Sequence, residues 1–208
     1  MEHKFQTIES VLGIGFKTVA LQKQLTKKDT ITAEHSEVVG KLCASITQEM
    51  IRQKKDIHFS MLEAYIAGSL HDIGKLKMGD EILKGKHAII SPKNNPSIRI
   101  HPLESYKILN ENGFESKIAE AALSHHERWD GSGYPNALKG NQISELANLI
   151  GIVDTFSALT QKRTYEEKRT EQEALEILKK DSKLFNPDML EIFFQFMEKH
   201  SNTFRSSF

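Results

Sequence analysis

The residues of this sequence best suited to chemistry are histidines and aspartates that recur in short polar patterns. His71 and Asp72 are adjacent at the end of an apolar segment, and a second pair, His125 and His126, precedes Glu127. A buried imidazole or carboxylate is unfavourable unless it is hydrogen-bonded, paired with an opposite charge or bound to a metal. The first pair therefore predicts either a satisfied structural pair or a metal site at a helix end.

Three isolated residues extend this pattern. His35 lies within a predicted helix, His101 stands at a predicted helix start, and Asp154 ends an apolar run. Each alone would most often be structural, but with the two pairs they give five histidines and two aspartates on separate predicted helices. Imidazole and carboxylate are ligands of iron, manganese and zinc. Thiolate ligation is not expected, because Cys43 is the only cysteine and its apolar neighbours indicate a buried structural thiol.

The adjacent pair His125 and His126 has two interpretations. Neighbouring residues on a helix point about 100° apart, so they rarely bind one compact ion, although both can line a site that holds several ions. Alternatively, histidines at an exposed helix C-terminus interact favourably with the helix dipole.

The elements that must position these residues are predicted to be almost entirely helical. Apolar residues recur at three- and four-residue spacings, and no run alternates polar and apolar residues between hairpin turns. The expected helices cover residues 33–51, 59–70, 102–109, 116–126, 143–159, 171–180 and 187–199. Gly74 is a predicted end for the second helix, and Asn112-Gly113 for the third. The fold class that follows is all-α, a single-domain helical bundle.

The composition limits the class of protein. The 208 residues suit one domain, and 28 basic residues balance 28 acidic ones, so the chain lacks the basic excess that drives binding to long nucleic acids. No segment approaches the ~20 apolar residues of a membrane span, and no signal peptide is evident. We therefore expect a cytoplasmic protein without membrane insertion. Residues 1–29 are interpreted as a helical extension or regulatory stub that precedes a domain over 30–208.

The order His35, His71-Asp72, Asp154 resembles the HD superfamily of metal-dependent phosphohydrolases. The fuller set resembles its HD-GYP branch, the bacterial cyclic-di-GMP phosphodiesterases. The matching stretches are His71-Asp72-Ile73-Gly74-Lys75, His101-Pro102, His125-His126-Glu127, Asp130-Gly131-Ser132-Gly133-Tyr134-Pro135 and the segment from Asp154 to Thr160 with Arg163 and Tyr165. The resemblance covers roughly residues 30–200 and predicts a buried dinuclear metal site in the bundle.

The resemblance also implies a role for each matching residue. The expected metal ligands are His35, His71, Asp72, His101, His125, His126 and Asp154. Asp72 would bridge two divalent ions, with iron preferred and manganese next. Lys75, one turn after His71 if that helix continues, would act in catalysis at the scissile phosphate. Gly133, Tyr134 and Pro135 would shape the substrate mouth and contact signalling partners such as diguanylate cyclase domains, and Arg163 would meet a phosphate or guanine.

The implied activity is hydrolysis of cyclic di-GMP to linear pGpG by a metal-bound hydroxide, with further cleavage to GMP left open. Paired divalent ions suit this chemistry because they lower the pKa of bound water and bind phosphate oxygens. Two alternatives are an HD-type nucleotidase or nucleotide phosphohydrolase with a single metal, and a non-catalytic scaffold that senses a cyclic dinucleotide. Another cyclic dinucleotide, such as cyclic GMP-AMP, fits the same residues.

The sequence departs from the family pattern at three places. Ile31 stands where members with three metals carry a glutamate, so we expect two ions, with His126 as a weaker or indirect ligand. Ser157 stands where many members have a second aspartate. The segment 85–99 differs from the usual proline-containing consensus, which affects the substrate contacts expected there.

Overall fold

The computed structural model describes residues 2–83, 96–161 and 169–200, with side chains from Val11 onward. These residues form helices and connecting turns without a strand, so the prediction of an all-α bundle is confirmed. The longer helices are α1 (Glu2–Lys28), α2 (Thr30–Arg52), α3 (Met61–Leu70), α5 (His101–Glu111), α6 (Ser116–Ser124), α7 (Glu145–Thr160), α8 (Glu171–Lys180) and α9 (Pro187–His200). The short ones are η1 (Ile73–Lys77), α4 (Asp80–Leu83), η2 (Pro96–Ile100), η3 (Gly140–Gln142) and η4 (Ser182–Leu184).

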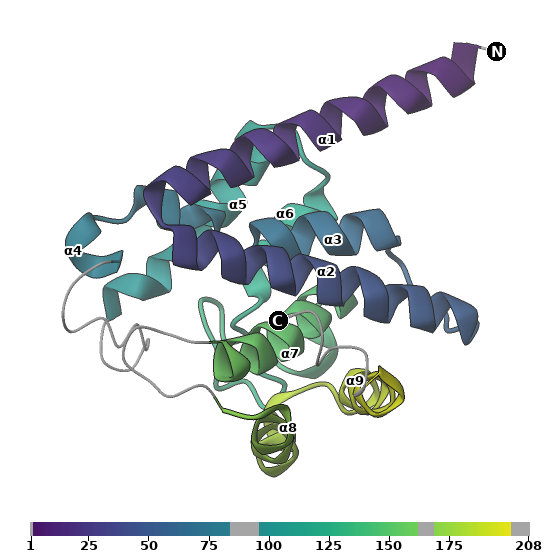
Figure 1. Cartoon of the computed structure of the whole chain (residues 1–208), viewed down its shortest axis with the longest axis vertical. Helices are drawn as coiled ribbons and strands as arrows, with labels where there is room; N and C mark the ends of the chain where they lie inside the picture. Colours follow the sequence, from purple (N-terminus) through teal and green to yellow (C-terminus); the bar gives the residue numbers. More distant parts are fainter. Residues whose placement is uncertain (1, 84–95, 162–168, 201–208) are drawn as a thin grey trace.

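The centre of the bundle is formed by α2, α3 and α7, with α5 and α6 behind them and α8 and α9 below α7 (Figure 1). Helix α7 is buried on almost every side over Leu146–Val153, which explains why its sequence is apolar without a polar stripe. Cys43 is fully buried in α2, as predicted, and burial raises the pKa of its thiol.

Helix α1 crosses one side of the bundle, and its N-terminal half extends beyond it (Figure 1). Its C-terminal half belongs to the same hydrophobic core as the other helices, because Leu21 and Leu25 are buried there. The short link at Asp29 also caps α2, since its carboxylate accepts a hydrogen bond from the Ile31 amide. The division of the chain at residue 30 stays a prediction.

Helix α3 ends at Leu70, well before Gly74, so the predicted helix-terminating role of Gly74 is wrong. Gly74 instead lets η1 approach α5, because a Cβ at this position would clash with the His101 carbonyl oxygen and the Ser105 amide. The Gly74 amide donates to Ser105 Oγ at 2.8 Å, and this hydroxyl donates to the His71 carbonyl at 2.7 Å. Ser105 therefore joins the segment that carries His71 to the helix that begins with His101.

Helices α2 and α3 are in backbone contact at Gly40, which yields a stability prediction. A Cβ on Gly40 would lie 2.8 Å from the Tyr65 carbonyl oxygen and 2.9 Å from Ser69 Cβ. We expect Gly40→Ala to lower the free energy of unfolding by about 1–3 kcal/mol, because the packed helices must separate. Denaturant unfolding measures this loss. Gly13→Ala is the matched control, since no atom lies within 4 Å of its Cβ; equal midpoints for both variants would contradict the prediction.

Candidate metal centre

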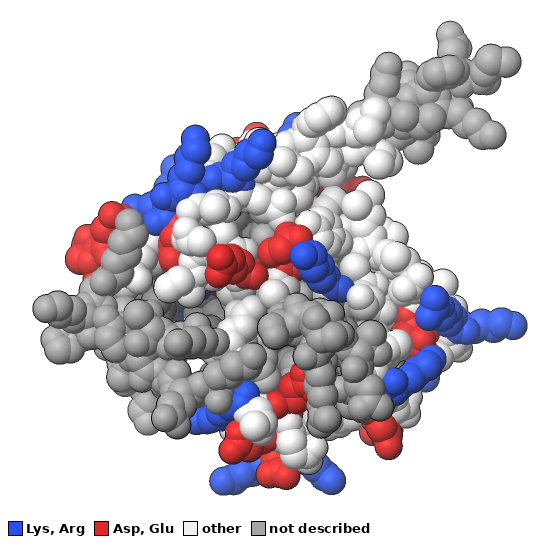
Figure 2. All heavy atoms as spheres, viewed as in Figure 1, with Lys and Arg blue, Asp and Glu red and all other residues white. Residues whose placement is uncertain are grey.

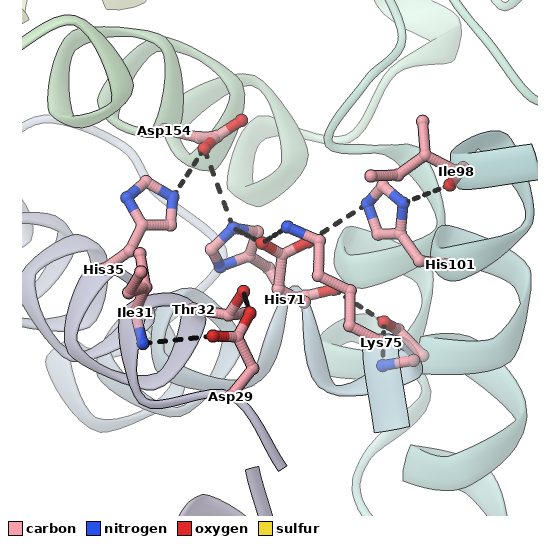
Figure 3. Close-up of polar contacts among 12 residues, drawn as sticks. Asp29, Ile31, Thr32, His35, His71, Lys75, Ile98, His101 and Asp154 are labelled. Carbon is pink, nitrogen blue, oxygen red and sulfur yellow. Dashed lines mark hydrogen bonds and ion pairs between the residues drawn. The ribbon is translucent and has the colours of Figure 1, made fainter. Parts of the chain in front are cut away.

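The structure brings all seven predicted ligands to one place between five elements. Figure 3 shows how His35, His71, His101 and Asp154 of this set face one another. His35 lies on α2, His71 and Asp72 lie between α3 and η1, and Asp154 lies on α7. His101 begins α5, while His125 and His126 follow α6. Their ligand atoms form three overlapping groups, each within 4.8 Å: His35 with His71 and Asp154, His71 with Asp72 and His125, and His101 with His125 and His126.

Hydrogen bonds to the main chain orient three of the rings. Nδ1 of His71, His101 and His125 lies 2.7, 2.5 and 2.7 Å from the carbonyl oxygen three residues earlier in the chain. A carbonyl oxygen can only accept, so each Nδ1 carries the proton and each Nε2 has a free lone pair. This is the arrangement found for histidines that bind a metal through Nε2.

His35 is held in the same way by side chains. Its Nδ1 lies 2.9 Å from Gln161 Oε1 and 3.3 Å from Ser157 Oγ, while its Nε2 lies 2.9 Å from Asp154 Oδ1. Ser157, at the place of the family's second aspartate, therefore contacts the predicted ligand His35 at Nδ1, the ring nitrogen that does not face Asp154. Gln161 was missed by sequence reasoning, and its only signal was its place one helical turn after Ser157.

The crowding of Nε2 atoms fits a bound cation. His101 Nε2 lies 3.3 Å from His125 Nε2 and 3.2 Å from His126 Nε2. Burial lowers the pKa of both His125 and His126 well below the usual range, and neighbouring histidines lower it further, so protons are disfavoured between these nitrogens. Among the described residues, His71 Nε2 has no hydrogen-bond partner although it is buried. A divalent ion would satisfy each of these lone pairs.

The two carboxylates supply negative charge on either side of His71. Asp72 Oδ2 lies 3.4 Å from His71 Nε2, and Asp154 Oδ1 lies 3.7 Å from the same nitrogen. Burial alone would raise the pKa of both aspartates, but the nearby cationic groups outweigh it and hold both well below the usual range. Burial would lower the pKa of His71, yet the two aspartates raise it. The carboxylates thus favour positive charge at this nitrogen, which a metal ion can supply.

The adjacent histidines do not lie on a helix, because α6 ends at Ser124. The angular argument that separates neighbouring helical residues therefore does not apply, and the expected helix over 116–126 is too long by two residues. The rings of His125 and His126 lie side by side, with centroids 4.0 Å apart and planes tilted by 42°. His125 is fully buried, so the interpretation as an exposed helix end is wrong for it.

Lys75 lies at the site although helix α3 does not continue to it. It lies in η1, three residues after Asp72, and its Nζ is 2.5 Å from Asp72 Oδ2. The helix does not continue from His71 to Lys75, so that condition is not met, but the ammonium group still lies beside the predicted ligand Asp72. It also contributes to the low pKa of Asp72.

The loop with Gly133, Tyr134 and Pro135 lies against the histidines. The Tyr134 ring stacks on the His126 ring with centroids 4.8 Å apart, and the Tyr134 amide donates to the His126 carbonyl at 3.2 Å. Burial, then Asp72 and Asp154, raise the pKa of the Tyr134 phenol, so this hydroxyl remains a neutral donor.

Arg99 was not identified from the sequence, because it lies in the irregular segment before α5. Its guanidinium carbon lies 4.9 Å from the centroid of the Tyr134 ring. A cation therefore lies over the same ring that stacks on the predicted ligand His126. Arg163 lies outside the described residues, and its role stays a prediction.

Glu127 positions the loop and supports a further prediction. It is 5% exposed, and its two carboxylate oxygens accept hydrogen bonds from the amides of Asn136 at 2.7 Å and Leu138 at 3.0 Å. In Glu127→Gln the side-chain NH₂ would face one of these amides, which leaves a buried donor unpaired at a cost of about 1–3 kcal/mol. We expect about 5- to 150-fold faster hydrogen exchange at these two amides.

The exposed Glu176→Gln on α8 is the control for that exchange measurement, and it should leave the loop unchanged. Unaltered protection of both amides in Glu127→Gln would show that the loop does not depend on this carboxylate.

Comparison with known proteins agrees with this fold and site. A model of the HD domain family matches residues 18–189. The chain therefore belongs to the HD domain family, whose members depend on metal ions, and the resemblance to its HD-GYP branch is confirmed. No helix among the described residues is both long and apolar enough to cross a membrane.

Two curated relatives and one solved structure illustrate the similarity. The chain is 33% identical over 196 residues to a cyclic di-GMP phosphodiesterase of Thermotoga maritima, covering 91% of this chain and 51% of that protein. It is 32% identical over 173 residues to 3′3′-cGAMP-specific phosphodiesterase 1 of Vibrio cholerae, covering 83% and 38%. The HD domain of the L. monocytogenes phosphodiesterase PgpH, solved with cyclic-di-AMP, has a TM-score of 0.62 at 17% identity, covering 89% of this chain and 96% of that one. The chain thus spans about half or less of the length of these curated relatives.

Proposed function

We propose that this chain is a metal-dependent phosphodiesterase that hydrolyses cyclic di-GMP to linear pGpG. The observation that carries the proposal is the convergence of seven ligand residues whose free Nε2 and carboxylate atoms face one centre, with the Lys75 ammonium beside them. The family and the activities of the curated relatives support the same chemistry.

The proposed cofactor is a pair of divalent ions, with iron preferred and manganese next, because the ligands are imidazoles and carboxylates without a thiolate. Bound ions would lower the pKa of water and bind phosphate oxygens. His35, His71 and Asp154 would hold one side, and Asp72 would bridge. The group of His101, His125 and His126 would hold the other side.

The other residues act on the substrate directly. The Lys75 ammonium can neutralise charge that develops on a phosphate oxygen, since it lies within a largely buried polar cluster where water screens it little. The neutral Tyr134 hydroxyl can donate a hydrogen bond, and the Arg99 guanidinium can bind a phosphate or stack on a base. Together with two bound divalent ions, these groups would give a neutral protein a locally cationic site for an anionic dinucleotide.

Two rival functions are less well supported. A nucleotidase with one metal needs only His35, His71, Asp72 and Asp154, and it leaves the cluster of three other histidines unexplained. A non-catalytic scaffold is disfavoured because the ligand set is complete and the lysine is in place. Cyclic GMP-AMP remains a candidate substrate, since a relative with that specificity matches over 83% of this chain.

The test combines elemental analysis with product analysis. Chain purified anaerobically and loaded with iron or manganese is incubated with cyclic di-GMP or cyclic GMP-AMP, and the products are separated by chromatography. We expect two ions per chain and pGpG from cyclic di-GMP. One ion per chain with cleavage of mononucleotides would favour the nucleotidase, and binding without any product would favour the scaffold.

The loop of Gly133 to Pro135 is also the proposed contact for signalling partners such as diguanylate cyclase domains. Its tip supports this role, because Pro135 and Asn136 are exposed while Tyr134 remains packed on His126. A partner seated there would lie beside Tyr134, whose ring packs on the predicted ligand His126.

A further inference from the structure

The His35 ring differs from three of the other predicted ligand rings in the way its Nδ1 is held. In those three rings Nδ1 lies beside a main-chain carbonyl oxygen, which a substitution of side chains does not remove. Nδ1 of His35 lies instead 2.9 Å from Oε1 of Gln161 and 3.3 Å from Oγ of Ser157. The state of this one ring therefore depends on the side chains beside it.

One face of α7 contacts both nitrogens of the His35 ring. Asp154, Ser157 and Gln161 are three and four residues apart, so at 100° per residue their directions on the helix differ by at most about 60°. Gln161 directly follows the last residue of α7, and its amide still donates to the Ser157 carbonyl oxygen at 3.0 Å. On the other side of the ring, Asp154 Oδ1 lies 2.9 Å from Nε2 (Figure 3).

The groups on the two sides of the ring favour different tautomers. In a neutral imidazole one nitrogen carries the proton and the other has a lone pair. Asp154 favours a proton on Nε2, which would prevent this nitrogen from binding an ion. The Gln161 amide oxygen can only accept, so it favours the proton on Nδ1. The Ser157 hydroxyl can donate as well as accept, so it does not select between the two tautomers.

We propose that Gln161 is a positioning residue that keeps the proton of His35 on Nδ1 and thereby strengthens binding of the ion beside His35. The inference rests on the proposed function only through its pair of divalent ions, and it does not depend on the substrate. An acceptor on the second nitrogen of a ligand histidine fixes the ring and raises its basicity, and its removal typically weakens metal binding about 10–100-fold. The histidine group on the other side of the site does not include His35, so its ion should bind as before.

A pair of substitutions of similar size separates the acceptor from the shape of the side chain. Gln161→Leu removes the acceptor, whereas Gln161→Glu keeps an acceptor oxygen. We expect the wild type to bind two Mn²⁺ ions per chain and Gln161→Leu to bind one of them about 10–100-fold more weakly. Gln161→Glu should bind both at least as tightly as the wild type. Free Mn²⁺ is measured by electron paramagnetic resonance during titration of the full chain.

Gln48→Leu, at an exposed position of α2, is the matched control and should bind both ions like the wild type. Acidic side chains also lie on the outer surface (Figure 2), and they can bind Mn²⁺ weakly. They are present in all of these proteins, so a difference between the variants reports on the buried site. Circular dichroism should be the same in all four proteins.

The tautomer is observed in proton–nitrogen correlation spectra of the chain loaded with Zn²⁺, which is diamagnetic. The signals of His35 are assigned by their loss in His35→Asn. We expect Nδ1 to carry the proton in the wild type and in Gln161→Glu. In Gln161→Leu this proton should exchange with water about 2- to 12-fold faster, because one hydrogen bond is lost. A proton on Nε2 in the loaded wild type would overturn the inference.

The outcomes of the Mn²⁺ titration distinguish this inference from the proposed function. Equal affinity in Gln161→Leu and the wild type would overturn the role of Gln161 and leave the proposed function intact. An equal loss in Gln161→Leu and Gln161→Glu would show that the acceptor oxygen is not the active feature, and it would also overturn the inference. A wild type without two bound ions would defeat the proposed pair of ions and this inference with it.

Discussion

Asp72→Ala is expected to abolish turnover of cyclic di-GMP and to release most of the bound metal. Asp72 contacts His71, His101 and Lys75 at 3.4, 3.1 and 2.5 Å, so its carboxylate is the negative charge shared by both sides of the site. Removing one partner from a buried charged cluster costs about 3–5 kcal/mol, which corresponds to about 10²–10³-fold or more in metal affinity. Metal content per chain and product formation are measured on the same preparation.

The exposed Asp56→Ala provides the control, and it should keep full metal content and full turnover. Asp72→Asn keeps the shape of the side chain while removing its charge, so it separates ligation from packing. We expect it to behave like the alanine variant, with an unchanged circular dichroism spectrum. Normal turnover in either variant would remove Asp72 from the metal centre and would defeat the proposed arrangement.

The fold could be predicted largely from local patterns, because most of the helices repeat their apolar residues at helical spacing. The expected helix over 171–180 agrees with α8 at both ends, and α9 differs from its expected range by one residue. These elements carry their own signals, since Thr170 with Glu173 forms a capping box and Pro187 suits a first turn. Where the residues that begin and end a helix lie within a few positions of its ends, the sequence alone is sufficient to predict the helix bounds.

The details of the site depend on contacts between distant segments, and these were harder to predict. Gly74 suggested a helix end, but its role is the close approach of η1 to α5, which only the packed bundle reveals. The turn at His125 likewise lies beyond the end of α6. The rings of His125 and His126, which would point about 100° apart on a helix, can therefore face one centre. The ligands themselves were found by residue type and order, because imidazole and carboxylate chemistry is visible in a sequence.

The supporting residues had weaker signals. Gln161 and Arg99 act through His35 and Tyr134, from which they are 126 and 35 positions distant in the sequence. Neither is unusual in type for its place, so composition and spacing do not distinguish them from surface residues. Glu127 was visible as part of a motif, but its bonds to the loop amides depend on how the loop folds back.

Lys75→Met is expected to lower kcat by about 10²–10³-fold while leaving the metal content unchanged, because one preorganised donor to a developing charge contributes about that much. Lys75 contacts Asp72 Oδ2 and is not itself among the ligand groups, so its loss should affect the reaction more than the ions. Methionine preserves the length of the apolar stem. Lys77→Met, exposed in the same η1, is the matched control and should keep full kcat. Steady-state kinetics and metal content are measured on metal-loaded protein. An unchanged kcat would show that the ammonium only balances the charge of Asp72. A loss of metal would show that Lys75 belongs to the ion-binding structure and is not a catalytic group.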